Sequence, residues 1–140
     1  MLSLEKGWSC HQGIPVIVKE AEMKVIGMVE IPKEPITNPI FTGTHVTTQV
    51  LSLDSQDFVV NIVNFGKGVR NKFHSHSTEQ LLFVTSGKGI VATEKEERVV
   101  TQGDVIIFYA GEKHWHGATA DSEFSHIYVT KVGSILTPLE

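Results

Sequence analysis

The stretch that decides the fold reads Gly68-Val-Arg-Asn-Lys-Phe-His74-Ser-His76-Ser-Thr-Glu-Gln80, and its distant counterpart reads Gly103-Asp-Val-Ile-Ile-Phe-Tyr-Ala-Gly-Glu-Lys-His114-Trp-His116. Residues two apart on a β-strand point to the same side, so His74 and His76 can present two ring nitrogens to one point. Neutral imidazole is the commonest metal ligand that proteins offer. A third histidine from a distant strand and an oxygen from Gln80 would complete a compact metal site.

Length, composition and charge limit the class of protein. The 140 residues fit one domain with a substantial core, and 41% hydrophobic content is typical of a globular chain. The formal net charge of −4, without a basic cluster, argues against a nucleic-acid partner. Charges interrupt the apolar stretches and no signal-peptide pattern is visible, so we expect no membrane partner and a cytoplasmic location. The single cysteine, Cys10, excludes an internal disulfide.

The prolines divide the chain into an arm and a body. All 5 lie outside residues 40–137, and proline cannot donate a hydrogen bond to a sheet. The body, residues 41–140, is therefore free to pair as strands, whereas residues 31–39 read as an irregular connector. Residues 1–40 form an N-terminal arm in which Pro15–Lys19 and Lys24–Ile31 are candidate strands.

The body has the pattern of an all-β domain. Short runs rich in Val, Ile, Thr and Phe alternate with turn residues, among which Ser86-Gly-Lys-Gly89 reads as one of the turns. Many short strands at regular spacing favour a sandwich or a barrel. The expected strands are 45–53, 58–65, 72–76, 80–85, 89–93, 98–101, 105–109, 113–116 and 124–132.

The first histidine segment resembles the first motif of the cupin superfamily, G-x5-H-x-H-x3/4-E-x6-G. The matching positions are Gly68, His74, His76, Gln80 and Gly87, so glutamine stands where the family has glutamate. Glu79 lies one position early for the ligand role and is the alternative fourth ligand.

The second segment resembles the second cupin motif, G-x5-P-x-G-x2-H-x3-N. Gly103, Gly111 and His114 match it, while Tyr109 replaces the proline and Ala118 the asparagine. The resemblance covers roughly residues 57–131. It implies an all-β double-stranded β-helix, the cupin or jelly-roll barrel.

Three shorter strings are similar to a group of small single-domain cupins that includes bacterial hydroxynitrile lyases and manganese cupins that cleave alkenes. The strings are Phe41-Thr-Gly-Thr44, Gly-Glu-Lys-His114-Trp-His116-Gly-Ala and Ser125-His126-Ile. The resemblance implies that one divalent metal, Mn, Fe, Zn, Ni or Co, is bound by His74, His76, Gln80 and His114.

The same likeness implies catalytic roles outside the ligand set. The histidine that matches His126 serves as a base beside the metal in the resembling lyases. His116 is in phase with His114, so it either faces the cavity as a second catalytic candidate or supports a neighbour by a hydrogen bond. We also expect Leu82 and Tyr128 to line the pocket.

Two classes of function stay open from the sequence. Three imidazoles and an amide are all neutral, so the metal keeps its charge and acts as a strong Lewis acid. This favours a small-molecule metalloenzyme of unknown substrate, either dioxygenase-like or hydroxynitrile-lyase-like. The alternative is a non-catalytic barrel that senses a metal-bound small molecule. We expect a homodimer in either case, in which the arm donates a strand to the partner.

Overall fold

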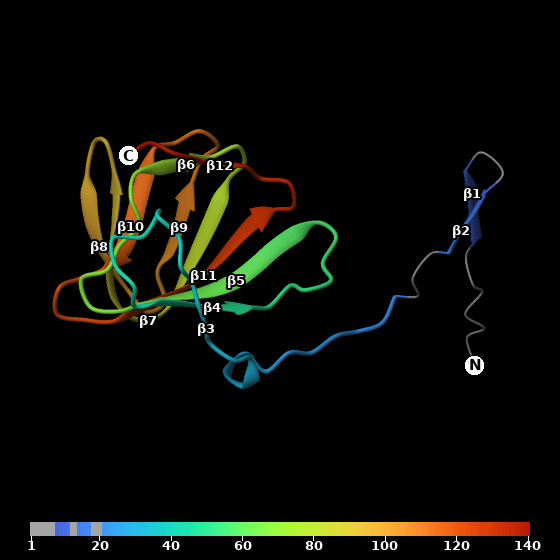
Figure 1. Cartoon of the computed structure of the whole chain (residues 1–140), viewed down its shortest axis with the longest axis horizontal. Helices are drawn as coiled ribbons and strands as arrows, with labels where there is room; N and C mark the ends of the chain where they lie inside the picture. Colours follow the sequence, from blue (N-terminus) through green and yellow to red (C-terminus); the bar gives the residue numbers. More distant parts are fainter. Residues whose placement is uncertain (1–7, 12–13, 18–20) are drawn as a thin grey trace.

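The computed structural model describes residues 8–11, 14–17 and 21–140 of the chain. Strands β3 to β12 form one curled antiparallel sheet, and β1 and β2 form a separate two-stranded sheet (Figure 1). The elements are β1 (Trp8–His11), β2 (Ile14–Ile17), η1 (Met28–Glu30), β3 (Glu34–Pro35), β4 (Val46–Val50), β5 (Phe58–Phe65), β6 (His74–His76), β7 (Gln80–Thr93), β8 (Glu97–Thr101), β9 (Val105–Phe108), β10 (His114–Ala118), β11 (Phe124–Lys131) and β12 (Leu136–Pro138). The all-β, cupin-type barrel expected from the sequence is confirmed.

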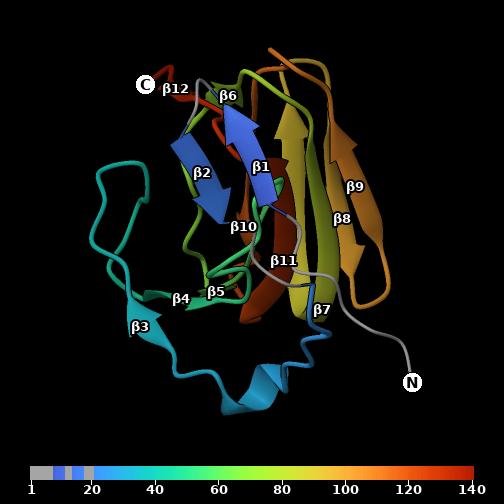
Figure 2. The same ribbon diagram turned by 90° about the vertical axis from the view of Figure 1, so that its right-hand side faces the viewer.

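Strand β7 joins the two layers of the barrel. Its first half pairs with β9 and β11, and its second half pairs with β8 and β10. One layer therefore reads β9-β7-β11-β5-β4-β3 and the other β12-β6-β10-β7-β8, and Figure 2 shows β7 beside β8 and β9. Between the layers lies an apolar core that contains Phe65, Leu82, Val91, Phe108 and Phe124.

The turn expected at residues 86–89 is wrong, because β7 continues through it. The strand bends there instead, with a register shift opposite Ser125 and His126. Gly87 has φ +74°, and a Cβ at Gly89 would lie 2.6 Å from the ring of Phe124. The glycines therefore provide a bend and a close approach of the backbone to an aromatic ring, rather than a chain reversal.

Two expectations about the ends of the chain also change. Lys24–Ile31 is not a strand but contains the short 3-10 helix η1. β2 covers the first part of the expected strand Pro15–Lys19, whose last two residues lie outside the described residues. Three prolines occur in strands, Pro15 in β2, Pro35 in β3 and Pro138 in β12. β3 and β12 are at the ends of the order of the large sheet, and β2 belongs to a sheet of two strands, so a missing N–H donor is tolerated in each.

Among the described residues, no helix has the length and apolarity needed to cross a membrane.

Candidate metal centre

Three buried histidines from two neighbouring strands converge at one point of the barrel. His74 and His76 lie on β6, and His114 on β10 stands directly opposite His74 in the antiparallel register. Each offers one ring nitrogen, and these three atoms lie within 4.8 Å of one another. The arrangement follows from the i, i+2 spacing on β6, which places both of its imidazoles on the inner face of the sheet. This part of the predicted ligand set comes together as expected.

The hydrogen bonds of these histidines leave lone pairs free for a cation. His74 Nδ1 lies 2.6 Å from the carbonyl oxygen of Lys72, and His114 Nδ1 lies 2.8 Å from that of Glu112. A ring nitrogen facing a carbonyl must carry the proton, so Nε2 of both rings is unprotonated. Metal-binding histidines commonly donate their other N–H to a carbonyl in this way.

Gln80 offers an amide oxygen beside the three histidines, the kind of fourth ligand atom that was expected. Its Oε1 lies 3.2 Å from Nε2 of His114, so two hydrogen-bond acceptors face each other in a buried place. His76 Nε2 is buried as well and has no hydrogen-bond partner among the described residues. A divalent ion between these atoms would satisfy all of them, so the residues present fit a metal of the nitrogen-and-oxygen class. Glu79, the alternative ligand, is exposed, whereas Gln80 is 4% exposed.

Burial keeps the cluster neutral. It lowers the pKa of His76 to about 4, with a smaller contribution from the charge of nearby His74. Burial likewise lowers the pKa of His114 to about 3, and it lowers the pKa of His74. Near neutral pH the imidazoles therefore hold lone pairs rather than extra protons, which is the form that a metal requires.

His116 and His126 form a second buried pair beside the ligands. His126 Nε2 lies 3.2 Å from His116 Nδ1, and both rings contact the ring of Phe65. The His116 ring is 5.8 Å from that of His74, centroid to centroid. Burial lowers the pKa of His126 to about 4 and holds the pKa of His116 well below its ordinary value. His116 lines the cavity and is also hydrogen-bonded to Asn71 and His126.

One cavity of about 350 Å³ connects the two groups of histidines. His74, His76, Gln80, His116 and His126 line it. Much of the remaining wall is apolar and includes Ile36, Ile40, Phe41, Val59, Val63, Phe65 and Leu136. Residues from the N-terminal 40 thus contribute to the wall, which composition and spacing did not indicate.

Of the two residues that were expected to line the cavity, Tyr128 does so and Leu82 does not. Tyr128 lines the cavity, and its hydroxyl accepts a hydrogen bond of 2.7 Å from Asn61 Nδ2. Burial raises the pKa of this hydroxyl. Leu82 is fully buried in the core cluster and is not part of the cavity wall.

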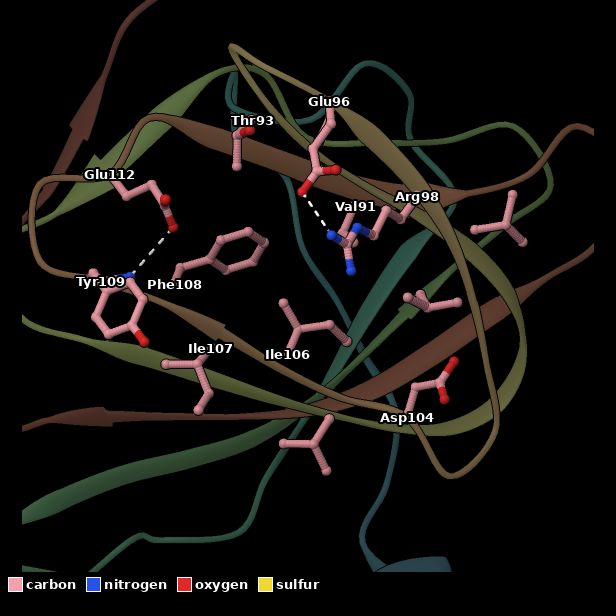
Figure 3. Close-up of a pocket in the computed structure, with 14 residues that line it drawn as sticks. Val91, Thr93, Glu96, Arg98, Asp104, Ile106, Ile107, Phe108, Tyr109 and Glu112 are labelled. Atoms are coloured by element: carbon pink, nitrogen blue, oxygen red, sulfur yellow. Dashed lines mark hydrogen bonds and ion pairs between the residues drawn. The ribbon is translucent and has the colours of Figure 1, made fainter.

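A second, larger cavity of about 710 Å³ lies beside β8 and β9 (Figure 3). Aliphatic side chains line it, and the ion pair between Arg98 and Glu96, at 3.0 Å, stands at its edge. It contains no histidine. Phe108 separates it from the metal centre, because this ring also stacks on His114 at 3.8 Å. The smaller cavity is therefore the one that the histidines line.

Asn71 belongs to the smaller cavity but was not expected there. It is 6% exposed and hydrogen-bonds to both the backbone and the ring of His116. Its position depends on the close approach of residues 70–71 to β10, seen in the bridge between Arg70 and Gly117. A bridge between segments so far apart has no local signal in the sequence.

Comparisons with known proteins identify the family of the chain. The model of the family described as "Cupin domain" matches residues 61–130. The chain is similar to an (R)-mandelonitrile lyase from Granulicella tundricola, with 34% identity over 112 residues, 77% of this chain and 82% of that protein.

Solved structures show the same fold. A cupin-like protein from Thermotoga maritima has 32% identity and a TM-score of 0.72, covering 79% of this chain and 87% of that one. The polyketide cyclase RemF from Streptomyces resistomycificus has a TM-score of 0.75 at 16% identity, with 85% and 87% covered. The chain belongs to the cupin family.

Proposed function

We propose that this protein is a metal-dependent lyase that cleaves a small hydroxynitrile into a carbonyl compound and hydrogen cyanide. The observation that carries the proposal is the presence of two different histidine groups on one cavity. His74 and His76 would bind a metal, and the neutral His126, paired with His116, would accept a proton. The similarity to an (R)-mandelonitrile lyase supports the substrate class.

The reaction needs one base and one site for negative charge. The base takes the hydroxyl proton of the substrate, the oxygen electrons form the carbonyl bond, and the carbon–carbon bond to the nitrile breaks. The electron pair leaves with cyanide, which receives the proton from the base. A divalent metal held by His74, His76, His114 and Gln80 would supply Lewis acidity for the charge that develops.

The residues of the chain suit the proton transfer. His126 is 0% exposed, and its pKa of about 4 keeps it unprotonated before the reaction. A general base must lie within hydrogen-bond reach of the proton that it removes, and His126 shares the cavity with the proposed ligands. A volume of about 350 Å³ suits a small substrate.

Two alternatives use the same metal site. A dioxygenase-like enzyme would need molecular oxygen, and a sensor would bind a small molecule without turnover. The pair His116 and His126 favours the lyase, because neither alternative requires a proton acceptor next to the ligands.

Turnover separates these possibilities. The protein, loaded in turn with Mn, Fe, Co, Ni and Zn, is mixed with (R)-mandelonitrile, and benzaldehyde and cyanide are measured with and without oxygen. We expect both products in equal amounts without oxygen for at least one metal. A requirement for oxygen would indicate the oxygenase, and saturable binding without products would indicate the sensor.

The His126→Ala variant tests the base. We expect a loss of roughly 10²–10⁴-fold in kcat, the usual contribution of a general base. Metal content, measured by elemental analysis, should stay unchanged because His126 is not among the proposed ligands. Full activity in this variant would place the base elsewhere, and His116 would then be tested in the same way.

A further inference from the structure

The side chain of Asn71 makes two hydrogen bonds to His116, and together they determine which atom donates and which accepts in each. Its Oδ1 accepts the backbone N–H of His116 at 2.8 Å. Its Nδ2 lies 3.2 Å from His116 Nε2. An amide oxygen only accepts and an amide nitrogen only donates, so the backbone contact fixes which end of the amide faces the ring. His116 Nε2 is therefore an acceptor. The backbone N–H of Asn71 also donates to the carbonyl of His116, at 3.0 Å, which holds the two residues together.

The position of the proton on His116 in turn determines the position of the proton on His126. A neutral imidazole carries one proton, so the proton of His116 is on Nδ1. That atom lies 3.2 Å from His126 Nε2, which must accept it. The proton of neutral His126 is then on Nδ1, which is buried and has no hydrogen-bond partner among the described residues. Each ring has one nitrogen that accepts a hydrogen bond, so each carries a single proton and both are neutral.

We propose that Asn71 is a positioning residue that fixes the hydrogen-bond direction through His116 and His126, so that both rings carry their proton on Nδ1. The role of the His126 Nε2 lone pair as proton acceptor rests on the proposed lyase function. Because this lone pair accepts the N–H of His116 in the resting protein, a substrate hydroxyl must displace that hydrogen bond to reach it. The direction of the hydrogen bonds does not rest on the lyase function, because it follows from the Asn71 contacts.

An Asn71→Asp variant should reverse the donor and acceptor in both ring hydrogen bonds, from residue 71 to His116 and from His116 to His126. The carboxylate offers a second acceptor where Nδ2 was a donor, so His116 must place its proton on Nε2. His116 Nδ1 then accepts from His126 Nε2, and the lone pair of His126 moves to Nδ1. The lone pair of the proposed base therefore moves to the other nitrogen of the ring, although the size of the side chain at position 71 hardly changes.

Nitrogen-15 NMR of the histidine rings measures this directly, because protonated and unprotonated ring nitrogens have well separated chemical shifts. The spectra are recorded on metal-free protein and on the zinc-loaded form, and the rings are assigned with His116→Ala and His126→Ala. In the wild type we expect Nδ1 protonated and Nε2 unprotonated in both rings. In Asn71→Asp we expect the opposite in both.

A matched control is Asn61→Asp. Asn61 also faces a single partner, the hydroxyl of Tyr128, which can turn to donate to a carboxylate. It makes no contact with His116 or His126 in the hydrogen bonds of the structure, so the tautomers of both should stay as in the wild type. A reversal in this variant too would show that added charge, rather than the Asn71 contact, sets the tautomers.

The proposal is overturned if wild-type His126 carries its proton on Nε2, a measurement that needs no variant. It is also overturned if a folded Asn71→Asp variant keeps the wild-type tautomers. With an active substrate, Asn71→Asp should lower kcat by roughly 10–100-fold with little change in KM or metal content. If the spectra agree and no substrate is turned over by any metal form, the positioning role stands and the lyase function falls.

Discussion

Gln80 determines the net charge of the proposed ligand set. Its amide is buried and faces Nε2 of His114 at 3.2 Å, while its neighbour Glu79 is exposed. A chain with glutamate at position 80 would place a negative charge among the imidazoles. The present chain has none there, so a bound metal would keep its full positive charge toward a substrate.

We expect Gln80→Glu to retain the metal and to lose activity. A carboxylate is a good ligand for a divalent cation, but its charge weakens the Lewis acid. The lyase kcat should fall roughly 10²-fold, the usual cost of weakening one electrostatic contact to the transition state. Elemental analysis and kcat measure the two effects, and Glu79→Gln is the control that should change neither. Loss of metal in the control would make Glu79 the fourth ligand.

The low pKa of His126 should make the metal-free protein less stable in acid. Its pKa is about 4 in the folded protein against an ordinary 6.5, so between these values the unfolded chain binds more protons. Stability is therefore complete above pH 6.5 and is lost as the pH falls toward 4, by about 3 kcal/mol from this residue. Denaturant unfolding of the metal-free protein at several pH values measures this loss. A His126→Gln variant should show a smaller pH dependence, and an unchanged dependence would contradict the assignment.

At the scale of the elements, the bend in β7 depends on the absence of side chains. Gly89 lies under the ring of Phe124, where a Cβ would come within 2.6 Å. The bend brings the second half of the strand to β10, which carries His114 and His116. A substitution at the bend of β7 can therefore shift β10 and its histidines without changing a proposed ligand.

We expect Gly89→Ala to lower the free energy of unfolding by about 1–3 kcal/mol, the usual cost of overpacking a tight core. The matched control is Gly27→Ala, since a Cβ there meets only the movable side chain of Glu30 at 3.2 Å. Urea unfolding of both variants is the measurement. Equal stability of the two would show that the Phe124 ring can move aside.

The sequence predicted some elements well and others poorly for physical reasons. The run 58–65 matches β5, because a run rich in Val, Ile and Phe between turn residues leaves little choice of boundary. The histidines converge as predicted, because the spacing on β6 sets their direction. The continuous β7 was missed, because glycine marks a bend and a turn alike. Asn71 was missed because its role depends on a contact with His116, a residue far away in the sequence.

At the scale of the whole molecule, one outer face of the barrel is apolar across four strands. The cross-strand registers align two rows whose members point away from the core. The rows are Ile62, Ile127, Phe83 and Val105, and Val60, Val129, Leu81 and Ile107. Of these, Ile62 is buried at 6% exposed, and the other seven are half-buried or exposed. Contiguous apolar surface of this kind is typical of an interaction site.

We propose that the homodimer expected from the sequence forms through this face. At a strand spacing near 4.8 Å the two rows cover on the order of 300 Å², less than the roughly 800 Å² per partner of a stable interface. The arm must add area, and Met23, Val25 and Val29 in it are at least 86% exposed.

Light scattering at micromolar concentration tests the interface. The wild type should be a dimer, and Ile107→Lys should be a folded monomer, because Ile107 is 49% exposed in the single chain and a lysine there disturbs no core. Val99→Lys, exposed on β8 outside these rows, is the control that should remain a dimer. A monomeric wild type would end the proposal.

The pairing of β7 with β8, β9, β10 and β11 has a consequence for the cooperativity of unfolding. Neither layer of the barrel possesses a complete set of strands without it, so neither can persist after the other is lost. Unfolding should consequently be all-or-none, with the amide protons of β7 exchanging with solvent only when the entire barrel opens. The histidine cluster would then be either wholly assembled or wholly dispersed.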